Sequence, residues 1–306
     1  MIMPMLEDTT TRLVADRRRL LGRLERAARR TRKRGQPEAI HDVRVITRQL
    51  EASLDLWRSI LPRRRRRRAR RALGALRRDL GPAREVRISL TLLHERFTAL
   101  PPDARLAAAL LQDFMRQRLE RLDARAARRC ARREIGRVRR RFEQVWEGDV
   151  LDGQPGMSLL EAGRARLAKR RNRGHMALRE AAQSGANERL HSARVAAKRW
   201  RYMLERLAVT DPTADVSEQT WLKEVQEALG QIQDLAVLRQ GAMRLGPRLA
   251  LAECEVSSEA VQSLLESLEA ERTECFRTFC RLAATGAPDR ALPLEAVPAA
   301  LRWRGA

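Results

Sequence analysis

The sequence predicts an all-α protein made of two similar helical halves, each the size of a four-helix bundle. Much of its apolar content is Leu, Ala and Val, a helix-forming mixture, and aromatic residues make up only 4% of the chain. Glycine (16) and proline (12) are too scarce for a turn-rich β protein. Helical periodicity runs along the chain, and the order of its elements returns after the midpoint. Hydrophobic residues reach 43%, which is enough to form a core.

Breaking residues divide the first half into helices. Gly35 ends a basic amphipathic stretch, and Pro37 stands where the first turn of the next helix accepts a proline. Pro62 ends that second helix. The pair Gly81-Pro82 should bend or break the chain, and a further proline pair ends the helix after it. The helices expected in this half are residues 12–34, 37–61, 63–80, 83–100 and 103–146.

The second half follows a linker at residues 147–156, where EGDVLDGQPG contains Gly and Pro and little charge. The helices expected after it cover residues 158–182, 188–209, a stretch before Gly230 that continues to 244, and 253–284. We therefore expect one domain over residues 9–285. Its halves are residues 9–148 and 157–285, and a Pro-rich tail occupies residues 286–306.

Two sequence motifs recur at nearly the same offset. HDVRV, which begins at His41, aligns with HSARV, which begins at His191, an offset of 150 residues. LGPAREV, from Leu80, aligns with LGQIQDL, from Leu229, an offset of 149 residues. Two matched blocks at nearly one offset indicate an internal duplication. Such a duplication commonly relates equivalent helices by a pseudo-twofold axis.

The chain is strongly basic. It has 63 Lys and Arg residues against 39 Asp and Glu, a formal net charge of +24, and only four of the basic residues are lysines. This charge attracts polyanions: nucleic acid, an anionic membrane surface and a non-nucleic polyphosphate are all compatible with it. A substrate with one or two charges would not need so much positive potential. The arginine bias favours phosphate, because a guanidinium contacts phosphate oxygens through a two-pronged fork.

Histidine and basic residues share one face of the second expected helix. At 100° per residue, His41, Arg44 and Arg48 fall within about 60° of one another. They lie opposite the apolar side that Ile46 and Leu50 mark. Cations three or four residues apart repel one another, by a few tenths of a kcal/mol for each pair. An anion opposite such a face would stabilise the helix.

The equivalent helix of the second half repeats this arrangement. His191, Arg194, Lys198 and Arg201 fall within about 80° of one another, opposite the apolar side that Trp200 marks. A run of charges on one helix usually means a solvated face. Histidine is rare in this chain, with four in all, and two of the four occupy matching positions. That match favours a binding role for both faces.

The pattern H-x-x-R-V-x-x-[KR]-[KR]-x-R, followed by L-G-x-x-x-[DE], occurs twice in an all-helical chain and resembles the CHAD domain. The resemblance covers roughly residues 9–285. The second half fits in full, up to Asp234, whereas the first half departs at Gln49, Glu51 and Glu85. The resemblance implies two four-helix bundles that enclose a basic groove or pore for inorganic polyphosphate. It also implies a cytoplasmic protein, associated with polyphosphate granules in some members.

The residues and the resemblance together predict the binding site. Polyphosphate carries charge on every unit and has no bases, so it calls for a dense lining of Arg, Lys and His. Both cationic faces should turn toward a common cavity, which would also accept phosphate or sulfate. The expected binding residues are His41, Arg44, Arg48, His191, Arg194, Lys198, Arg199 and Arg201. Four further residues near the L-G-x-x-x-[DE] motif are also expected to contact polyphosphate: Arg77, Arg84, Arg87 and Lys223.

Two other function classes, catalysis and nucleic-acid binding, can be compared with polyphosphate binding. Catalysis is not expected, because no P-loop and no paired carboxylates beside the histidine faces are present, and no cofactor or metal site is indicated. A non-specific nucleic-acid-binding protein is the alternative function, since charge supports it, although no zinc-finger spacing, RNP aromatics or basic zipper occurs. Four scattered cysteines, no signal peptide and no long apolar run predict a cytoplasmic protein outside membranes.

Overall fold

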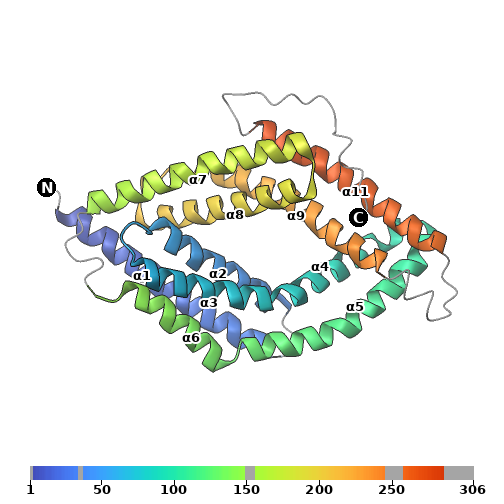
Figure 1. The fold of residues 1–306 in the computed structure, drawn as a ribbon, viewed down its shortest axis with the longest axis horizontal. Helices are drawn as coiled ribbons and strands as arrows, with labels where there is room; N and C mark the ends of the chain where they lie inside the picture. Colours follow the sequence, from blue (N-terminus) through green and yellow to red (C-terminus); the bar gives the residue numbers. More distant parts are fainter. Residues whose placement is uncertain (1–2, 34–36, 149–155, 245–257, 286–306) are drawn as a thin grey trace. The chain divides into compact units, whose positions relative to one another are not determined.

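The computed structural model describes residues 3–33, 37–148, 156–244 and 258–285. It confirms the all-α prediction, since the described residues form helices and no strand (Figure 1). The predicted tail at 286–306 and most of the predicted linker lie outside the described residues. In chain order the helices are α1 (Met3–Arg32), α2 (Pro37–Leu56), α3 (Arg63–Asp79), α4 (Gly81–Arg96), η1 (Phe97–Ala99), α5 (Pro102–Arg129), α6 (Arg132–Glu143), η2 (Gln144–Trp146), α7 (Gly156–Ser184), α8 (Asn187–Thr210), α9 (Glu218–Met243) and α11 (Ser258–Thr285).

The helices form two compact units, and each unit draws on both halves of the sequence. Unit 1 consists of Met1–Ala83, Asp123–Gly174 and Lys198–Thr220. Unit 2 consists of Arg84–Leu122, His175–Ala197 and Trp221–Ala306. The division between the units falls within α4, α5, α7, α8 and α9. Compact units that mix the two halves are compatible with an internal duplication, and the halves at 9–148 and 157–285 stay a prediction.

The structure confirms most of the predicted breaks between helices and differs at two of them. The second helix was expected to reach Leu61, before Pro62, but α2 ends at Leu56. The chain breaks at Gly81, where α3 ends and α4 begins. The single helix expected over 103–146 is wrong, because α5 ends at Arg129 and α6 begins at Arg132. No Gly or Pro marks this break. It is stabilised by a tertiary contact: the Arg32 guanidinium of α1 donates a hydrogen bond of 2.9 Å to the carbonyl oxygen of Cys130, which is buried.

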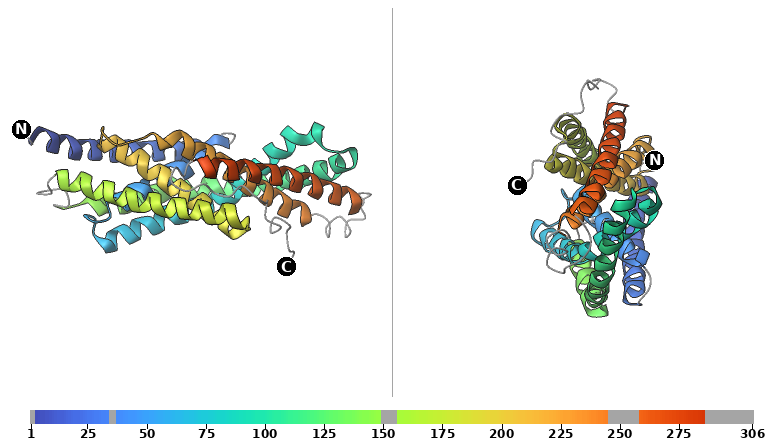
Figure 2. Two further views of the ribbon diagram at one scale, coloured as in Figure 1. Left: turned by 90° about the horizontal axis from the view of Figure 1, so that it is seen from above. Right: turned by 90° about the vertical axis from the view of Figure 1, so that its right-hand side faces the viewer.

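Two buried tryptophans are among the largest side chains in the core of unit 1, where α1 packs on α2, α2 on α3 and α3 on α6 (Figures 1 and 2). Trp57 and Trp200 are almost fully buried. Two glycines of α7 make room for their rings. A Cβ atom at Gly163 would lie 2.9 Å from the Trp57 ring, and one at Gly174 would lie 2.6 Å from the Trp200 ring. Any larger residue at either position would force a tryptophan to move.

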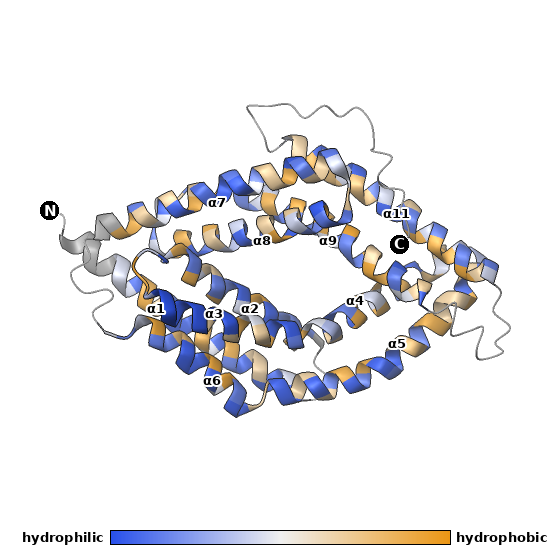
Figure 3. Ribbon diagram, viewed as in Figure 1, coloured by the Kyte–Doolittle hydropathy of each residue, from blue (hydrophilic) through white to orange (hydrophobic). Residues whose placement is uncertain are grey.

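Aliphatic side chains dominate the core of unit 2. Leu93 of α4, Leu111 of α5, Leu235 of α9 and Leu264 of α11 are buried in one cluster. Hydrophilic and hydrophobic residues alternate along these helices, as an amphipathic helix with one buried face requires (Figure 3). The resulting packing of α4, α8 and α9 within this unit positions the side chains described next.

Candidate functional site

In unit 2, the predicted binding residues of α4 and α8 gather around α9. His191 is exposed on α8, and its Nδ1 lies 3.3 Å from Oε1 of Gln233. Arg194, one turn further along α8, has a guanidinium nitrogen 3.9 Å from a carboxylate oxygen of Asp234. We call this the unit 2 cluster, and its members are Arg84, Arg87, His191, Arg194, Gln233 and Asp234.

Cations outnumber carboxylates in the unit 2 cluster. Burial lowers the pKa of the Arg84 guanidinium, the Asp234 carboxylate raises it, and the charges of Arg194 and Arg87 lower it. Arginine nevertheless stays protonated in proteins, so the cluster sets three positive charges against one negative charge. The Nε atom of Arg194 is buried and has no hydrogen-bond partner within the described part of the chain. A buried donor in this state favours an incoming anion.

In unit 1, the remaining predicted residues lie on α2, α3 and the second part of α8. His41 is exposed near the start of α2, and Arg44 and Arg48 are half-buried further along it. Arg44 donates a hydrogen bond to the backbone carbonyl oxygen of Arg77, on α3. We call this set the unit 1 group, and its members are His41, Arg44, Arg48, Arg77, Lys198, Arg199 and Arg201.

Carboxylates lie among the cations of the unit 1 group. Glu51 of α2 forms an ion pair with Arg77, and both side chains are largely buried. Glu205 of α8 lies 3.3 Å from Arg201. Its carboxylate also accepts a hydrogen bond of 3.4 Å from the Gln49 amide, which connects α8 to α2. The glutamates therefore neutralise part of this group within the protein.

The two cationic faces, which we call stripes, occupy matching positions on α2 and α8. The first stripe is His41, Arg44 and Arg48, and the second is His191, Arg194, Lys198 and Arg201. His41 is the fifth residue of α2, and His191 is the fifth residue of α8. Arg44 and Arg194 are both half-buried, and so are Arg48 and its counterpart Lys198. Lys223 behaves differently, because it is exposed on α9 and lies 3.8 Å from Glu227 of the same helix.

Sequence reasoning missed the acidic and basic partners of Arg199. Burial lowers the pKa of Arg199, the charges of Arg170 and Arg70 lower it further, and Glu51 and Asp55 raise it. Asp55 in turn pairs with Arg166 and Arg170 of α7. The spacing of Arg166 and Arg170, four residues apart in a basic helix, is a signal that could have indicated a shared partner.

The unit 2 cluster also contains two residues, Gln233 and Asp234, that are not among the predicted binding residues. Asp234 is the last position of the repeated motif, whereas nothing in the sequence marks Gln233 as a binding residue. Their position one turn after Gly230 on α9 places both beside α8. Across the described residues, no group of three or more His, Cys, Asp or Glu side chains could hold a metal ion. None of the described helices is long and apolar enough to cross a membrane.

Comparisons with known proteins identify the family and agree with the all-α fold. The CHAD domain, as a family profile, matches residues 15–242. The crystal structure of the CHAD domain from the plant Ricinus communis is similar, with a TM-score of 0.60 and 20% identity over 89% of each chain. The structure of PptA from Streptomyces chartreusis has a TM-score of 0.66 and 18% identity, over 90% of this chain and 98% of that chain. The curated proteins give no match.

Proposed function

The chain belongs to the CHAD domain family, and from that premise we propose that it binds inorganic polyphosphate without catalysing a reaction on it. The observation that carries the proposal is the unit 2 cluster. Arg84, Arg87 and Arg194 come from two helices and lie within electrostatic range of one another around Asp234. Their mutual repulsion is relieved when a polyanion binds across them.

Polyphosphate suits these side chains chemically. Each guanidinium donates two parallel hydrogen bonds to phosphate oxygens, and charge-assisted bonds of this kind are stronger than neutral ones. The imidazole of His191 donates a hydrogen bond when it is neutral and adds charge when it is protonated. Lys198, Arg199 and Arg201 continue the positive track along α8. The unit 2 cluster and the unit 1 group are each basic enough to bind part of a polyphosphate chain, and a phosphate or sulfate ion would bind to the same side chains.

Calorimetric titration with long-chain polyphosphate tests the proposal. The variant His191→Ala, Arg194→Ala, Lys198→Ala removes three contacts from one helix. At about 1.5 kcal/mol for each charge-assisted contact, affinity should fall by about a thousandfold. The wild-type affinity should also decrease steeply with salt, because polyanion binding releases counterions. Unchanged affinity in a variant with normal helicity would place the binding site elsewhere.

Competition with nucleic acid separates the proposal from its alternative. Wild-type protein is first bound to labelled double-stranded DNA or RNA, and polyphosphate is added at matched charge concentration. Displacement of the nucleic acid supports polyphosphate as the preferred ligand. Failure to displace it would favour a non-specific nucleic-acid-binding protein.

The proposal extends to the location of the protein. A polyphosphate-binding protein in the cytoplasm would collect on polyphosphate granules, where its ligand is concentrated. A fluorescent fusion of the full chain should co-localise with granules, and the triple variant should spread evenly. If the wild type and the triple variant were distributed alike in the cell, polyphosphate binding would not determine where the protein is located.

A further inference from the structure

A basic cavity lies between α1 and α2 of unit 1, and none of the predicted binding residues lines it. Its volume is about 610 Å³. The six residues that line it are Arg23, Arg26, Arg29, Arg30, Asp42 and Ile46. Four guanidiniums therefore stand around a space that contains one carboxylate. A cavity of this size can hold a small organic or inorganic anion.

The cavity opens on a different face of α2 from the predicted stripe. Asp42 and Ile46 are four residues apart and share one face of the helix. At 100° per residue, the middle of that face is about 150° from the middle of the stripe formed by His41, Arg44 and Arg48. A ligand in this cavity therefore contacts other residues than a polyphosphate chain on the stripe.

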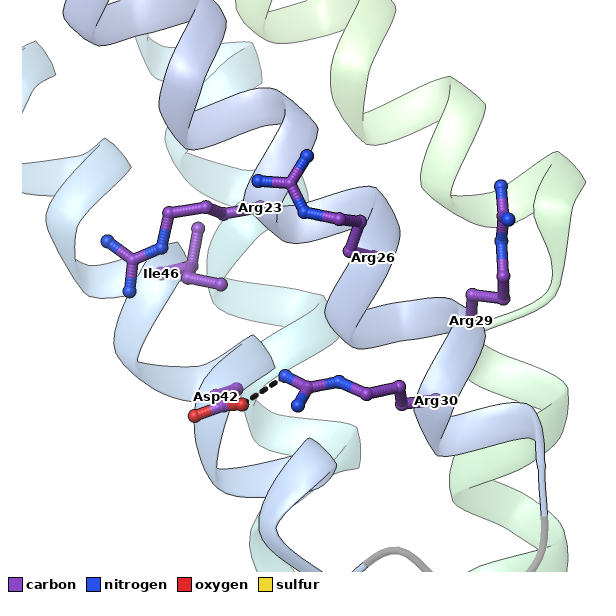
Figure 4. Close-up of a pocket in the computed structure, with 6 residues that line it drawn as sticks. All are labelled: Arg23, Arg26, Arg29, Arg30, Asp42 and Ile46. Carbon is purple, nitrogen blue, oxygen red and sulfur yellow. Dashed lines mark hydrogen bonds and ion pairs between the residues drawn. The ribbon is translucent and has the colours of Figure 1, made fainter.

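The arginines of α1 form a row along the cavity. Arg23, Arg26 and Arg30 fall within about 60° of one another on the helix and span about 10 Å along its axis. Figure 4 shows Arg23 and Arg30 reaching from α1 toward α2, with Arg29 further from α2 than the other three. Like charges at these spacings repel one another. An anion in the cavity removes that repulsion.

Contacts within the protein position the arginines of this row but neutralise little of their positive charge. Arg30 forms an ion pair with Asp42 (Figure 4). Arg23 donates a long hydrogen bond, 3.5 Å, to the uncharged Gln49 amide oxygen. A guanidinium nitrogen of Arg26 lies 3.4 Å from the position that a Cβ atom of Gly22 would take, so the glycine leaves room for this side chain. Positive charge remains in excess around the cavity.

The geometry points to a second anion site, in which Arg23, Arg26 and Arg30 bind a linear triphosphate group. A single phosphate reaches one or two of these guanidiniums, whereas a chain of three phosphates can contact all three. The triphosphate can belong to inorganic tripolyphosphate or to a nucleoside triphosphate.

The test compares two variants of the full chain, each of which should lose affinity for only one of two ligands, tripolyphosphate or long-chain polyphosphate. Calorimetry measures the binding of tripolyphosphate, adenosine triphosphate, orthophosphate and long-chain polyphosphate. Arg23→Gln with Arg26→Gln should weaken tripolyphosphate binding roughly a hundredfold and leave long-chain polyphosphate binding within about threefold. The variant His191→Ala, Arg194→Ala, Lys198→Ala should show the opposite pattern. Circular dichroism checks that helicity is kept, and Arg26→Gln alone replaces the double variant if it is not.

A matched control removes the same charge elsewhere. Arg118 and Arg121 are exposed on α5 and have the same spacing of three residues. Arg118→Gln with Arg121→Gln should leave tripolyphosphate affinity unchanged. An equal loss in this control would show that net charge alone decides binding, and would overturn the proposal.

Other outcomes are equally decisive. Tighter binding of adenosine triphosphate than of tripolyphosphate would identify the nucleoside form as the ligand, and equal binding would identify the triphosphate group itself. A loss of orthophosphate affinity in the Arg23 and Arg26 variant as large as its loss of tripolyphosphate affinity would overturn the proposal. So would a loss of long-chain polyphosphate affinity in the Arg23 and Arg26 variant equal to its loss of tripolyphosphate affinity, since the cavity would then be part of one continuous site. A failure of polyphosphate binding alone would contradict the proposed function and leave the tripolyphosphate result to decide this site.

Discussion

In the unit 1 group, Glu51 and Glu205 lie among the cations, whereas the unit 2 cluster sets Asp234 against three guanidiniums. At the repeat offset, Gln49 and Glu51 of the first half correspond to Arg199 and Arg201 of the second. The structure gives these departures a role. Gln49 bonds to Glu205, and Glu51 pairs with Arg77. Two positions that are basic in the second half therefore form internal contacts in the first half, which leaves less positive charge for a ligand.

The largest expected effect compares equivalent variants of the two stripes. His41→Ala, Arg44→Ala, Arg48→Ala should weaken long-chain polyphosphate binding by only about tenfold, against about a thousandfold for His191→Ala, Arg194→Ala, Lys198→Ala. The reason is that Glu51, on the same helix as the first stripe, sets a negative charge beside Arg77, the residue of α3 that Arg44 contacts. Titration calorimetry of both variants at one salt concentration measures the difference. Equal losses would show that both stripes bind polyphosphate alike.

A second prediction concerns charge that stabilises unit 1. Asp55 is largely buried between Arg166 and Arg170. Asp55→Asn leaves two buried guanidiniums without their counter-charge and should lower the free energy of unfolding by about 3 kcal/mol. Urea denaturation measures this change. Asp113→Asn, at an exposed ion pair with Arg116, is the control and should have little effect.

The same carboxylate gives stability a defined pH dependence. Burial raises the pKa of Asp55, but the hydrogen bond from Arg166 and the charges of both arginines outweigh it, so the pKa lies below its ordinary value. As the pH falls, the unfolded chain therefore takes up this proton first. The contribution of Asp55 is complete above about pH 4 and is lost below it. The wild type and Asp55→Asn should converge in stability under acid; a constant difference would contradict this assignment.

Local patterns predicted much of the fold and the stripes. Helix periodicity placed His41 and His191 on their faces, because residues three and four apart share a face wherever the helix packs. The break at Cys130 escaped prediction, since Arg32, from a distant helix, stabilises it. The composition of the two units also depends on contacts between segments far apart in sequence.

The side-chain contacts of a residue were harder to predict from the sequence than its place on a helix face. Asp234 was visible as a motif residue, but its contact with Arg194 requires α8 and α9 to pack side by side. The α1 cavity shows the same limit. Its arginines were noticed as a basic amphipathic stretch, and only the packing of α1 on α2 brings them to Asp42.

Two glycines sharpen the contrast between the units. At Gly174, in unit 1, a Cβ atom would lie 2.6 Å from Trp200, so Gly174→Ala should cost about 2 kcal/mol. At Gly230, in unit 2, a Cβ atom would meet no described atom within 4 Å. Gly230→Ala should raise stability by about 0.5–1 kcal/mol, because alanine favours the helix. Thermal denaturation of both variants checks the opposite signs; destabilisation by Gly230→Ala would reveal a packing role for the motif glycine.

The smallest expected effect comes from a variant that should make the first stripe bind polyphosphate more tightly. Glu51→Gln removes the carboxylate that pairs with Arg77, and the freed guanidinium can then bind phosphate. Long-chain polyphosphate affinity should rise by about threefold to fivefold, the scale of one partly screened ion pair. Glu161→Gln, at an exposed position of α7 in the same unit, makes the same change in net charge and serves as the control. An equal rise in both variants would mean that net charge sets the affinity, and that the placement of Glu51 among the cations does not explain why the two stripes differ.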